Sequence, residues 1–401
     1  MNFKSIRDMD LQGQKVLLRV DLNVPARRGK VMDTTRIDRL KPTIDYLREA
    51  GAQILLLSHF GRPEGEQNPE MSMAFLLPTL QERWGCDIRF AQDCIGPKAE
   101  VITSSLNDGD VALLENLRFH KGEKANDPEF VSQLAELGDV YANDAFSAAH
   151  RAHASTEGLA NQLPAAAGLL MEQELNALDA ALEHPEKPVA AIVGGSKIST
   201  KLNVLDNIVK RVDYLILGGA MANTFVYAQG GNIGSSLCET DMKAEALNIM
   251  ETARTHDCEI VLPIDSVVTE ELKVNALSET VPSSDIPEGK MAIDIGPQSI
   301  AAVESVLEQS KTLLWNGPMG VFELKPFDNG TNALAQKAAE LTRAGKLKSI
   351  AGGGDTVSAL ENADVCQDFT YISTAGGAFL EWLKGKTLPG VAALENAAKS
   401  S

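Results

Sequence analysis

The sequence predicts an α/β protein made of two doubly wound parallel-sheet domains joined by a connecting helix and a hinge. Three observations predict this fold. Short apolar segments alternate with helical patterns through the first half of the chain. A unit of strand, glycine and helix recurs through the second half. The chain has 401 residues, which is too long for one ordinary hydrophobic core.

In the first half, apolar strands each run into a polar segment. These are KVLLRV (15–20) before DLNVP, QILLL (53–57) before SHFGRP, VALL (111–114) before ENLRFHKGE, and VYA (140–142) before NDAFS. Helical spacing between the first two places Ile37, Leu40, Ile44 and Leu47 on one face, with Thr34 or Thr35 starting the helix. Strands that are apolar throughout are buried on both faces, so we expect a parallel sheet covered by helices.

The pattern changes around Pro164 to a single helix, LLMEQELNALDAALEHP (169–185). Apolar residues line one of its faces, and Pro185 and Pro188 follow its end. We interpret this helix as the connector between an N-terminal domain (1–168) and a C-terminal domain (186–386).

The second half repeats one local pattern in VAAIVGGSKIS, YLILGGAMANTF, TLLWNGPMGVF, SIAGGGDTVSAL and YISTAGGAFLEWL. A glycine after one strand usually marks only a turn, but five such units predict a Rossmann-like domain. The stretch KSIAGGGDTVSAL (348–360) is the centre of this prediction. Its glycines would let backbone amides approach a phosphate at a helix start. The alternative is an ordinary turn in which Asp355 or Thr356 caps the helix.

Composition narrows the class of protein. The net charge of −18 argues against non-specific binding to nucleic acid or an anionic membrane. The five cysteines have neither CxxC nor zinc-site spacing, which is typical of a reducing compartment. The charged start MNFKSIRDMD has no apolar signal region, and no segment is long enough to span a bilayer. We therefore expect a cytoplasmic protein.

Ligands of open α/β sheets bind beyond the carboxyl ends of the strands. In the first half, the residues placed there or nearby are mostly cations and hydrogen-bonding groups: Asp21, Asn23, Arg36, His59, Arg62, Arg118 and Arg151. Each arginine alone would usually be a solvated surface residue. Together in an acidic protein they predict a small anionic ligand, because arginine binds phosphate and carboxylate through two hydrogen bonds.

Arg36 lies in the first turn of its predicted helix, where a cation is unfavourable against the helix dipole. Either Asp33 and Asp38 compensate it, or it serves an anion.

The second half offers glycines, lysines and acids at the equivalent positions. If a helix begins near Ser196, Lys197 and Lys201 project from one face near its start, which suggests nucleotide phosphates. A solvated lysine pair is the alternative. Glu323 suits ribose hydroxyls, and Asp355 suits Mg²⁺. The chain lacks GxxxxGK[ST], GxGxxG, GxSxG and HExxH, so neither a P-loop nor a dinucleotide site is supported.

Motifs spread over nearly the whole chain closely resemble those of the phosphoglycerate kinase family. They are RVDLNVP (19–25), SHFGRP (58–63), LLENLRFHKGE (113–123), NDAFSAAHRAHAST (143–156), GGSKISTKL (194–202), LILGGAMANTF (215–225), WNGPMGVFE (315–323) and AGGGDT (351–356). The resemblance implies a monomeric two-domain kinase. Its N-terminal domain would bind 3-phosphoglycerate or 1,3-bisphosphoglycerate, and its C-terminal domain Mg-ATP or Mg-ADP. It also implies that residues 387–401 pack back on the N-terminal domain.

By match to the family motifs, the acid would be held by Asp21, Asn23, Arg36, His59, Arg62, Arg118 and Arg151. Nucleotide would be held by Gly195, Lys197, Lys201, Gly219, Leu237, Asn316, Pro318, Glu323, Gly353, Gly354, Asp355 and Thr356, with Mg²⁺ on Asp355. The catalytic set would be Arg36, Lys197, Lys201, Gly353 and Gly376. One departure is Ala375, where many family members have a glycine; we expect little effect from it.

A carboxylate that accepts a phosphoryl group is already ionised at neutral pH, so the reaction needs positioning and charge neutralisation rather than a general base. We expect domain closure to assemble the site and exclude water. Two alternatives stay open at this point. A non-catalytic two-lobed anion-binding protein would bind one small anion and no Mg-nucleotide. An NAD(P)-dependent oxidoreductase would bind nicotinamide cofactor.

Overall fold

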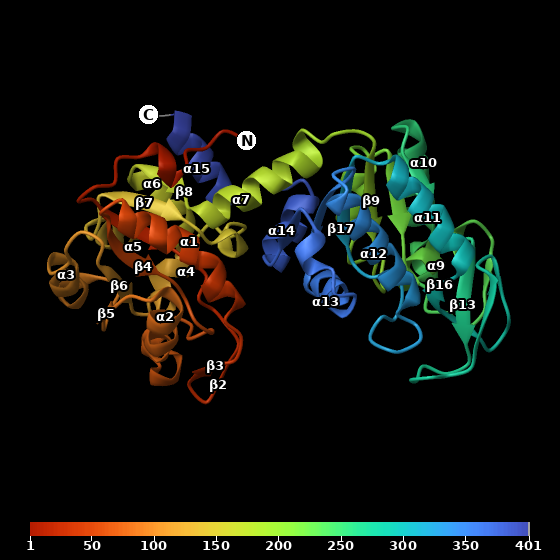
Figure 1. The fold of residues 1–401 in the computed structure, drawn as a ribbon, viewed down its shortest axis with the longest axis horizontal. Coiled ribbons are helices and arrows are strands. Elements are labelled where there is room, and N and C mark those ends of the chain that lie inside the picture. Colours follow the sequence, from red (N-terminus) through yellow and green to blue (C-terminus); the bar gives the residue numbers. More distant parts are fainter. Residues whose placement is uncertain (400–401) are drawn as a thin grey trace. The chain divides into compact units, whose positions relative to one another are not determined.

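The computed structural model describes residues 1–399, which separate into two compact units (Figure 1). Unit 1 comprises Met1–Asn176 and the C-terminal segment from Thr387, and unit 2 comprises Ala177–Lys386. The boundary falls inside helix α7, Leu169–Leu178, which continues as a π-helical turn, Asp179–Glu183.

Unit 1 contains a parallel sheet in the order β5-β6-β4-β1-β7-β8. Its strands are β1 Lys15–Arg19, β4 Gln53–Leu57, β5 Ile88–Ala91, β6 Val111–Leu114, β7 Val140–Asn143 and β8 Ala165–Ala167, and a small hairpin pairs β2 Ala26–Arg27 with β3 Lys30–Val31. The helices are α1 Thr35–Glu49, α2 Leu77–Trp84, α3 Gly96–Ser104, α4 Lys121–Ala125, α5 Pro128–Ala135, α6 Leu159–Gln162 and α15 Pro389–Lys399.

Alternate residues of the unit 1 strands pack against α1 and α2. Val16 and Leu18 of β1 share one apolar cluster with Ile37 of α1 and Trp84 of α2, and the Trp84 indole donates to the Ile37 carbonyl (2.9 Å). Burial of one such aliphatic side chain contributes about 1.5–3 kcal/mol. Helix α1 begins at Thr35, as predicted, and this core fixes the strand ends that carry the candidate site.

The two ends of the chain meet in unit 1. Ser5 forms a parallel bridge with Ala167 of β8, and α15 packs against β8 and α6 (Figure 1). The Gly390 amide also donates to the Ala149 carbonyl (2.9 Å). The last helix of the chain is therefore part of the first unit.

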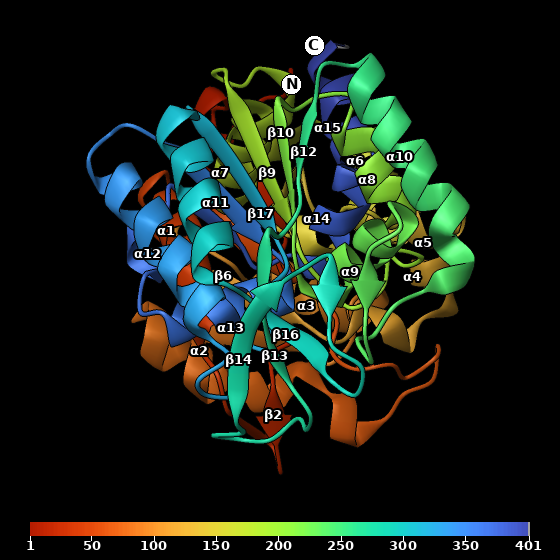
Figure 2. The same ribbon diagram turned by 90° about the vertical axis from the view of Figure 1, so that its right-hand side faces the viewer.

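Unit 2 contains a second parallel sheet in the order β12-β10-β9-β17-β18-β19. Its strands are β9 Val189–Val193, β10 Tyr214–Leu217, β12 Glu259–Val261, β17 Thr312–Asn316, β18 Lys348–Gly352 and β19 Tyr371–Ser373. The helices are α8 Leu202–Ile208, α9 Gly219–Ala228, α10 Lys243–Thr255, α11 Pro297–Gln309, α12 Asn329–Arg343, α13 Gly354–Asn362 and α14 Gly376–Leu383. Figure 2 shows α11 and α12 on one side of this sheet and α8 and α10 on the other.

Unit 2 also holds an antiparallel sheet in the order β14-β13-β16, which sequence reasoning did not predict. Its strands are β13 Asp265–Thr269, β14 Ser278–Pro282 and β16 Met291–Ile295, and β11 Asn232–Ile233 pairs with β15 Asp285–Ile286. The sheet forms one wall of the candidate site in unit 2.

Within residues 1–399, no helix is both long enough and apolar enough to span a bilayer.

Two candidate ligand sites

The predicted unit 1 residues do follow neighbouring strands of the sheet. Asp21 and Asn23 follow β1, His59 and Arg62 follow β4, Arg118 follows β6, and Arg151 comes after β7. These strands are adjacent in the order β6-β4-β1-β7. The carboxyl ends of adjacent parallel strands meet at one edge, so the sheet gathers these side chains there.

Arg36 reaches from the start of α1 to the segment after β1. Its Nη1 donates to Asp21 Oδ2 (2.8 Å) and to the Asn23 carbonyl (3.0 Å). Asp33 Oδ1 instead accepts from the Thr35 amide, and Asp38 pairs with Arg83. Of the two acids considered as compensation for Arg36, Asp33 has its pKa lowered by its hydrogen bonds to Thr35 and, to a smaller extent, by the nearby Arg36. Asp21 is the ion-pair partner of Arg36, whose side chain stays partly exposed.

A basic pocket of about 260 Å³ lies in unit 1. Its lining residues are Arg62, Glu64, Arg118, Lys124, Arg151 and His153. Burial and the neighbouring Arg151 and Arg19 lower the pKa of Arg118 to about 10. Burial, and then Arg151, also lower the pKa of His153 to about 4. The clustered positive charges disfavour one another, which means that an anion in this pocket would relieve the repulsion.

His59 is buried beside this pocket, and burial and Arg19 lower its pKa far below the usual range. Its Nδ1 lies 2.9 Å from Arg19 Nη2. Because a guanidinium can only donate, Nδ1 must accept, and the proton of the neutral ring is on Nε2. His59 is thus a fixed neutral hydrogen-bond donor.

Arg19, Lys124 and His153 were not predicted as site residues. Arg19 is a buried cation of β1 that donates to Ser155 Oγ (2.9 Å), and Ser155 donates to the buried carboxylate of Glu123 (2.6 Å). An arginine inside an apolar strand was a readable signal, because a buried charge needs partners. No comparable signal marked Lys124, which looks like an ordinary surface lysine of α4.

The turns after the unit 2 strands pack on one another through glycines. Gly195 has φ +144° and Gly219 has φ +65°, and a Cβ on Gly219 would lie 2.6 Å from the Gly195 carbonyl oxygen. A Cβ on Gly194 would overlap the Pro318 carbonyl oxygen. The turns that follow β9, β10 and β17 can therefore approach so closely only without side chains.

The triple-glycine turn after β18 is tied to the end of β17. Asn316 Nδ2 donates to the Gly352 carbonyl (2.7 Å), and Thr356 Oγ1 accepts from the Gly317 amide (2.7 Å). Gly353, with φ +102°, is the N-cap of α13. The alternative in which Asp355 or Thr356 caps this helix is wrong, because both lie inside its first turn.

Lys197 and Lys201 precede helix α8, which begins at Leu202 and not near Ser196. The predicted projection from one helix face is therefore wrong. Lys201 Nζ turns back to Asn316 Oδ1 (2.7 Å) and to the Gly194 carbonyl (2.6 Å). Burial lowers the pKa of Lys201 to about 8, and Asp355 opposes this shift. Lys197 is exposed.

A cavity of about 400 Å³ opens between these turns and the antiparallel sheet. Of the predicted nucleotide residues, those lining it are Gly195, Gly219, Leu237, Pro318, Glu323 and Asp355. Asn316 and Thr356 are buried beneath the turns. Asp294 of β16 also lines the cavity and was missed; burial raises its pKa to about 7.

Gly376 begins α14 after β19, the strand next to β18, and is not among the residues lining the cavity. Ala375 is 6% exposed, so its methyl group is buried, whereas Gly377 is exposed. Gly354 has open space where a side chain would project.

Two groups of residues have metal-ligand chemistry. Asp355 presents an exposed carboxylate in the first turn of α13, at the cavity. Mg²⁺ takes oxygen ligands, few of them from protein, so one carboxylate beside a phosphate site fits it. In unit 1, ligand atoms of Asp93, Cys94 and His120 lie within 4.8 Å of one another. Burial holds the pKa of the Cys94 thiol well above its usual range, which disfavours the thiolate that a metal needs.

An α/β fold with a basic pocket in one unit and a glycine-lined cavity in the other fits the class of small-molecule kinases. Comparison with family models is more specific. The model described as "Phosphoglycerate kinase" matches residues 6–386, and the chain belongs to the phosphoglycerate kinase family.

Individual relatives agree. The chain is 55% identical over 399 residues to the phosphoglycerate kinase of Rhizobium leguminosarum bv. trifolii, covering 99% of this chain and 100% of that one. It is 56% identical over 395 residues to that of Ruegeria sp., covering 98% and 100%. The structure of phosphoglycerate kinase from Coxiella burnetii superposes with a TM-score of 0.93 at 40% identity, covering 99% and 100%.

Proposed function

We propose that this protein is an enzyme that transfers a phosphoryl group reversibly between 1,3-bisphosphoglycerate and ADP, giving 3-phosphoglycerate and ATP, in glycolysis and gluconeogenesis. The observation that carries the proposal is the pairing of two half-sites in one chain of this family: clustered arginines at the strand ends of unit 1, and a glycine cradle with a buried lysine in unit 2. Membership of this family favours the kinase over the anion-binding protein and the oxidoreductase that sequence reasoning left open.

We assign the acid to unit 1. Arg62, Arg118 and Arg151 supply the charge to bind the phosphate that is not transferred, because they line the basic pocket. Asp21, Asn23 and neutral His59 bind the hydroxyl and carboxyl groups; Asp21 accepts, and the His59 Nε2–H donates. Arg36 supplies positive charge to the phosphoryl group in transfer.

We assign the nucleotide to unit 2. The amides of Gly353 and Gly354, at the start of α13, face phosphate oxygens. Gly195, Gly219, Leu237 and Pro318 provide the surface for the base, and Glu323 accepts from the ribose hydroxyls. Lys197, Lys201 and Gly376 complete the phosphate contacts, while Asn316 and Thr356 hold the turns in place.

No side chain has to remove a proton in this reaction. The attacking group is a carboxylate, which is ionised at neutral pH. Neutral His59 is held by Arg19 and cannot readily become protonated, so it serves as a donor and not as an acid–base catalyst. The work of the chain is to orient the two ligands in line and to neutralise charge.

Mg²⁺ would be held by Asp355 and nucleotide phosphate oxygens, and when bound it would neutralise phosphate charge. Removal of divalent cations with a chelator is then expected to abolish turnover and leave 3-phosphoglycerate binding intact.

The proposal requires a closed state in which the ligands of the two units meet away from water. It also keeps the expectations of a monomer and of a cytoplasmic location. The second is supported by the five cysteines, which lie within the described residues and are all free.

The decisive experiment is a coupled spectrophotometric assay of the purified chain with 3-phosphoglycerate and Mg-ATP. Turnover is expected only when both substrates are present. Isothermal titration that detects one small anion and no Mg-nucleotide would overturn the proposal.

A further inference from the structure

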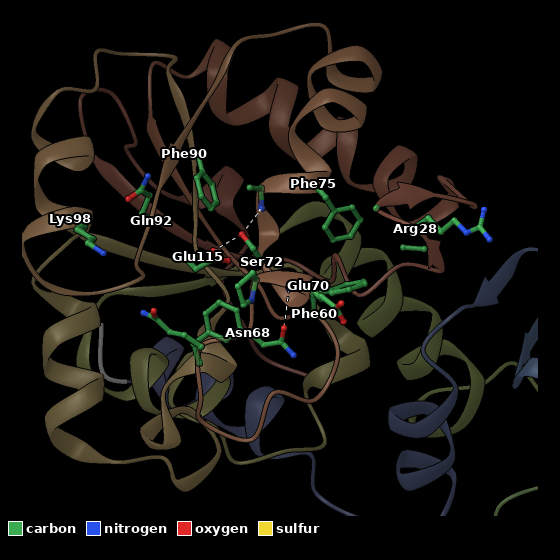
Figure 3. Close-up of a pocket in the computed structure, with 16 residues that line it drawn as sticks. Arg28, Phe60, Asn68, Glu70, Ser72, Phe75, Phe90, Gln92, Lys98 and Glu115 are labelled. Carbon is green, nitrogen blue, oxygen red and sulfur yellow. Dashed lines mark hydrogen bonds between the residues drawn. The ribbon is translucent and has the colours of Figure 1, made fainter.

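A cavity of about 1080 Å³ lies in unit 1 and shares no lining residue with the basic pocket (Figure 3). It is bounded by the β2–β3 hairpin, the segment from Gln67 to Phe75, the end of β5 and the start of α3. Its volume is at the upper end of the range for sites that bind small organic molecules.

The walls of this cavity are aromatic. Phe60, Phe75 and Phe90 line it, and each is only partly buried. The Phe60 and Phe75 rings meet at an angle of 62° with centroids 4.8 Å apart. Partly exposed phenyl rings in a concave site gain by covering another apolar or aromatic surface.

The cavity also carries unpaired positive charge. Figure 3 shows Lys98 at one end and Arg28 at the other. Within residues 1–399, neither has a carboxylate within ion-pair distance. Glu115 is used internally, because it accepts from Ser72 Oγ (2.6 Å) and the Met73 amide (2.7 Å). Glu70 is the other lining carboxylate, so the lining holds two cations and two carboxylates, and the two cations are exposed.

Arg28 occupies an unusual position for an arginine. The hairpin pairs Ala26 with Val31 and Arg27 with Lys30, so Arg28 and Gly29 form a two-residue turn with φ +49° and +71°. Asn-Gly or Asp-Gly is the pair that this turn favours. The backbone alone therefore does not explain an arginine here. Its exposed side chain extends away from the phenyl rings in Figure 3 and would have to turn toward them to pair with a ligand.

We propose that this cavity binds a small aromatic anion, a molecule with one or two rings and a carboxylate, sulfonate or phosphate group. The rings lie against Phe60 and Phe75, and the acidic group pairs with Arg28 or Lys98.

The cavity is connected by hydrogen bonds to the basic pocket. Asn116 Nδ2 donates to the carbonyls of Phe60 (2.7 Å) and Met71 (2.9 Å), and its Oδ1 accepts from the Arg118 amide (3.1 Å). Arg118 Nη1 in turn donates to the Gly61 carbonyl (2.7 Å). A ligand that shifts the Phe60 carbonyl would therefore act on Asn116, which also binds the Arg118 amide. This coupling rests on the proposed function, in which Arg118 binds 3-phosphoglycerate.

Binding is tested with 8-anilinonaphthalene-1-sulfonate, titrated into the full chain saturated with Mg-ADP and followed by fluorescence. One site per chain is expected. Arg28→Asn removes the charge and suits the turn, and Lys98→Gln removes the other charge; each is expected to raise Kd about two- to fivefold. Phe75→Ala is expected to raise it further. Arg27→Gln, next to Arg28 but not lining the cavity, is the matched control and is expected to leave Kd unchanged.

Equal Kd values for the wild type, Arg28→Asn and Lys98→Gln would overturn the proposed site. The proposed site would also be overturned if Arg27→Gln raised Kd as much as Arg28→Asn does. Thermal denaturation of each variant checks that its fold is retained. If Phe75→Ala unfolds, the comparison of Arg28→Asn and Lys98→Gln with the wild type still decides the test.

Coupling is tested by isothermal titration of 3-phosphoglycerate with and without saturating 8-anilinonaphthalene-1-sulfonate. The probe is expected to change the Kd of 3-phosphoglycerate at least twofold in the wild type. In Arg28→Asn this change is expected to be smaller. An unchanged Kd would overturn the coupling. Failure of 3-phosphoglycerate to bind under either condition would instead overturn the proposed function, while the fluorescence result would still decide the cavity.

Discussion

At the residue scale, Arg36 lies in the first turn of α1, where the helix dipole disfavours a cation. Its hydrogen bonds offset this unfavourable position. Its hydrogen bonds to Asp21 and to the Asn23 carbonyl hold it at the strand end. The sequence showed that Arg36 was electrostatically out of place, but its partner could not be predicted. Asp21 lies 15 residues away in the chain and is brought near where the chain returns through the β2–β3 hairpin to α1.

Replacement of Arg36 by alanine is expected to reduce kcat by about three orders of magnitude, because the residue is proposed to act on charge that develops during transfer. Nucleotide Kd, measured by isothermal titration, is expected to stay within twofold. Arg36→Lys, which keeps the charge but not the two-hydrogen-bond geometry, is expected to recover part of the activity. Turnover of the alanine variant within a few-fold of the wild type contradicts the assignment.

Lys201 predicts a pH dependence. Its pKa is lowered to about 8 by burial, so it is charged below pH 8 and loses its proton above. Only the charged form attracts phosphate. The kcat/KM for Mg-nucleotide is therefore expected to fall tenfold per pH unit above about pH 8, since this ratio reports the free enzyme.

The control for this profile is Lys201→Gln, which is expected to have low activity with no decline of the same kind. Nucleotide phosphates titrate near pH 6 and do not produce it. If kcat/KM still falls above about pH 8 in Lys201→Gln, the titrating group is not Lys201.

At the element scale, the glycine turns decide how closely the ends of β9, β17 and β18 approach. Their recurrence after strands was readable from the sequence, and so were most strands of both parallel sheets. The edge strand β5 was missed because Arg89 interrupts its apolar pattern. The edge strand β8 was missed because it consists of alanines, which are weak strand formers.

The antiparallel sheet of unit 2 and its part in the cavity were also missed. β14 is mostly exposed, so no apolar run marks it. Asp294 alternates with the apolar residues of β16 and looks like a solvent-facing residue, but it is buried and accepts from the Gly330 amide (2.8 Å). Gly330 lies 36 residues from Asp294 in the chain. A sequence pattern records only local spacing, so this contact could not be predicted from it.

Two adjacent glycines allow a matched comparison. Gly353→Ala places a Cβ 2.7 Å from Asn316 Nδ2 at φ +102°, so it is expected to lower the free energy of unfolding by about 1–3 kcal/mol. Gly354→Ala meets no neighbour within 4 Å in the first turn of α13 and is expected to be neutral or stabilising by up to about 1 kcal/mol. Urea denaturation measures both. A neutral effect of Gly353→Ala would show that the turn tolerates a side chain there, and a loss of stability in Gly354→Ala would contradict the open space at that position.

At the scale of the whole molecule, unit 1 is discontinuous in sequence, since its last helix comes after all of unit 2. Leu394 of α15 is fully buried. Leu394→Ala is expected to lower the free energy of unfolding by about 2–5 kcal/mol, because it leaves a cavity. Nucleotide Kd is expected to stay unchanged, because the binding residues belong to unit 2.

Lys399→Ala, an exposed change in the same helix, is the control and is expected to shift stability by less than about 0.5 kcal/mol. A loss of nucleotide affinity in Leu394→Ala, with the control unaffected, would show that the two units do not respond independently.

Because α15 belongs to unit 1, the residues that complete this unit are synthesised after all of unit 2. The ribosome makes most of the first unit early, yet that unit waits for the final residues before its surface over β8 and α6 is covered. Unit 2 has all of its residues sooner. A chain without α15 is therefore expected to leave apolar surface over β8 and α6 open to chaperones and proteases.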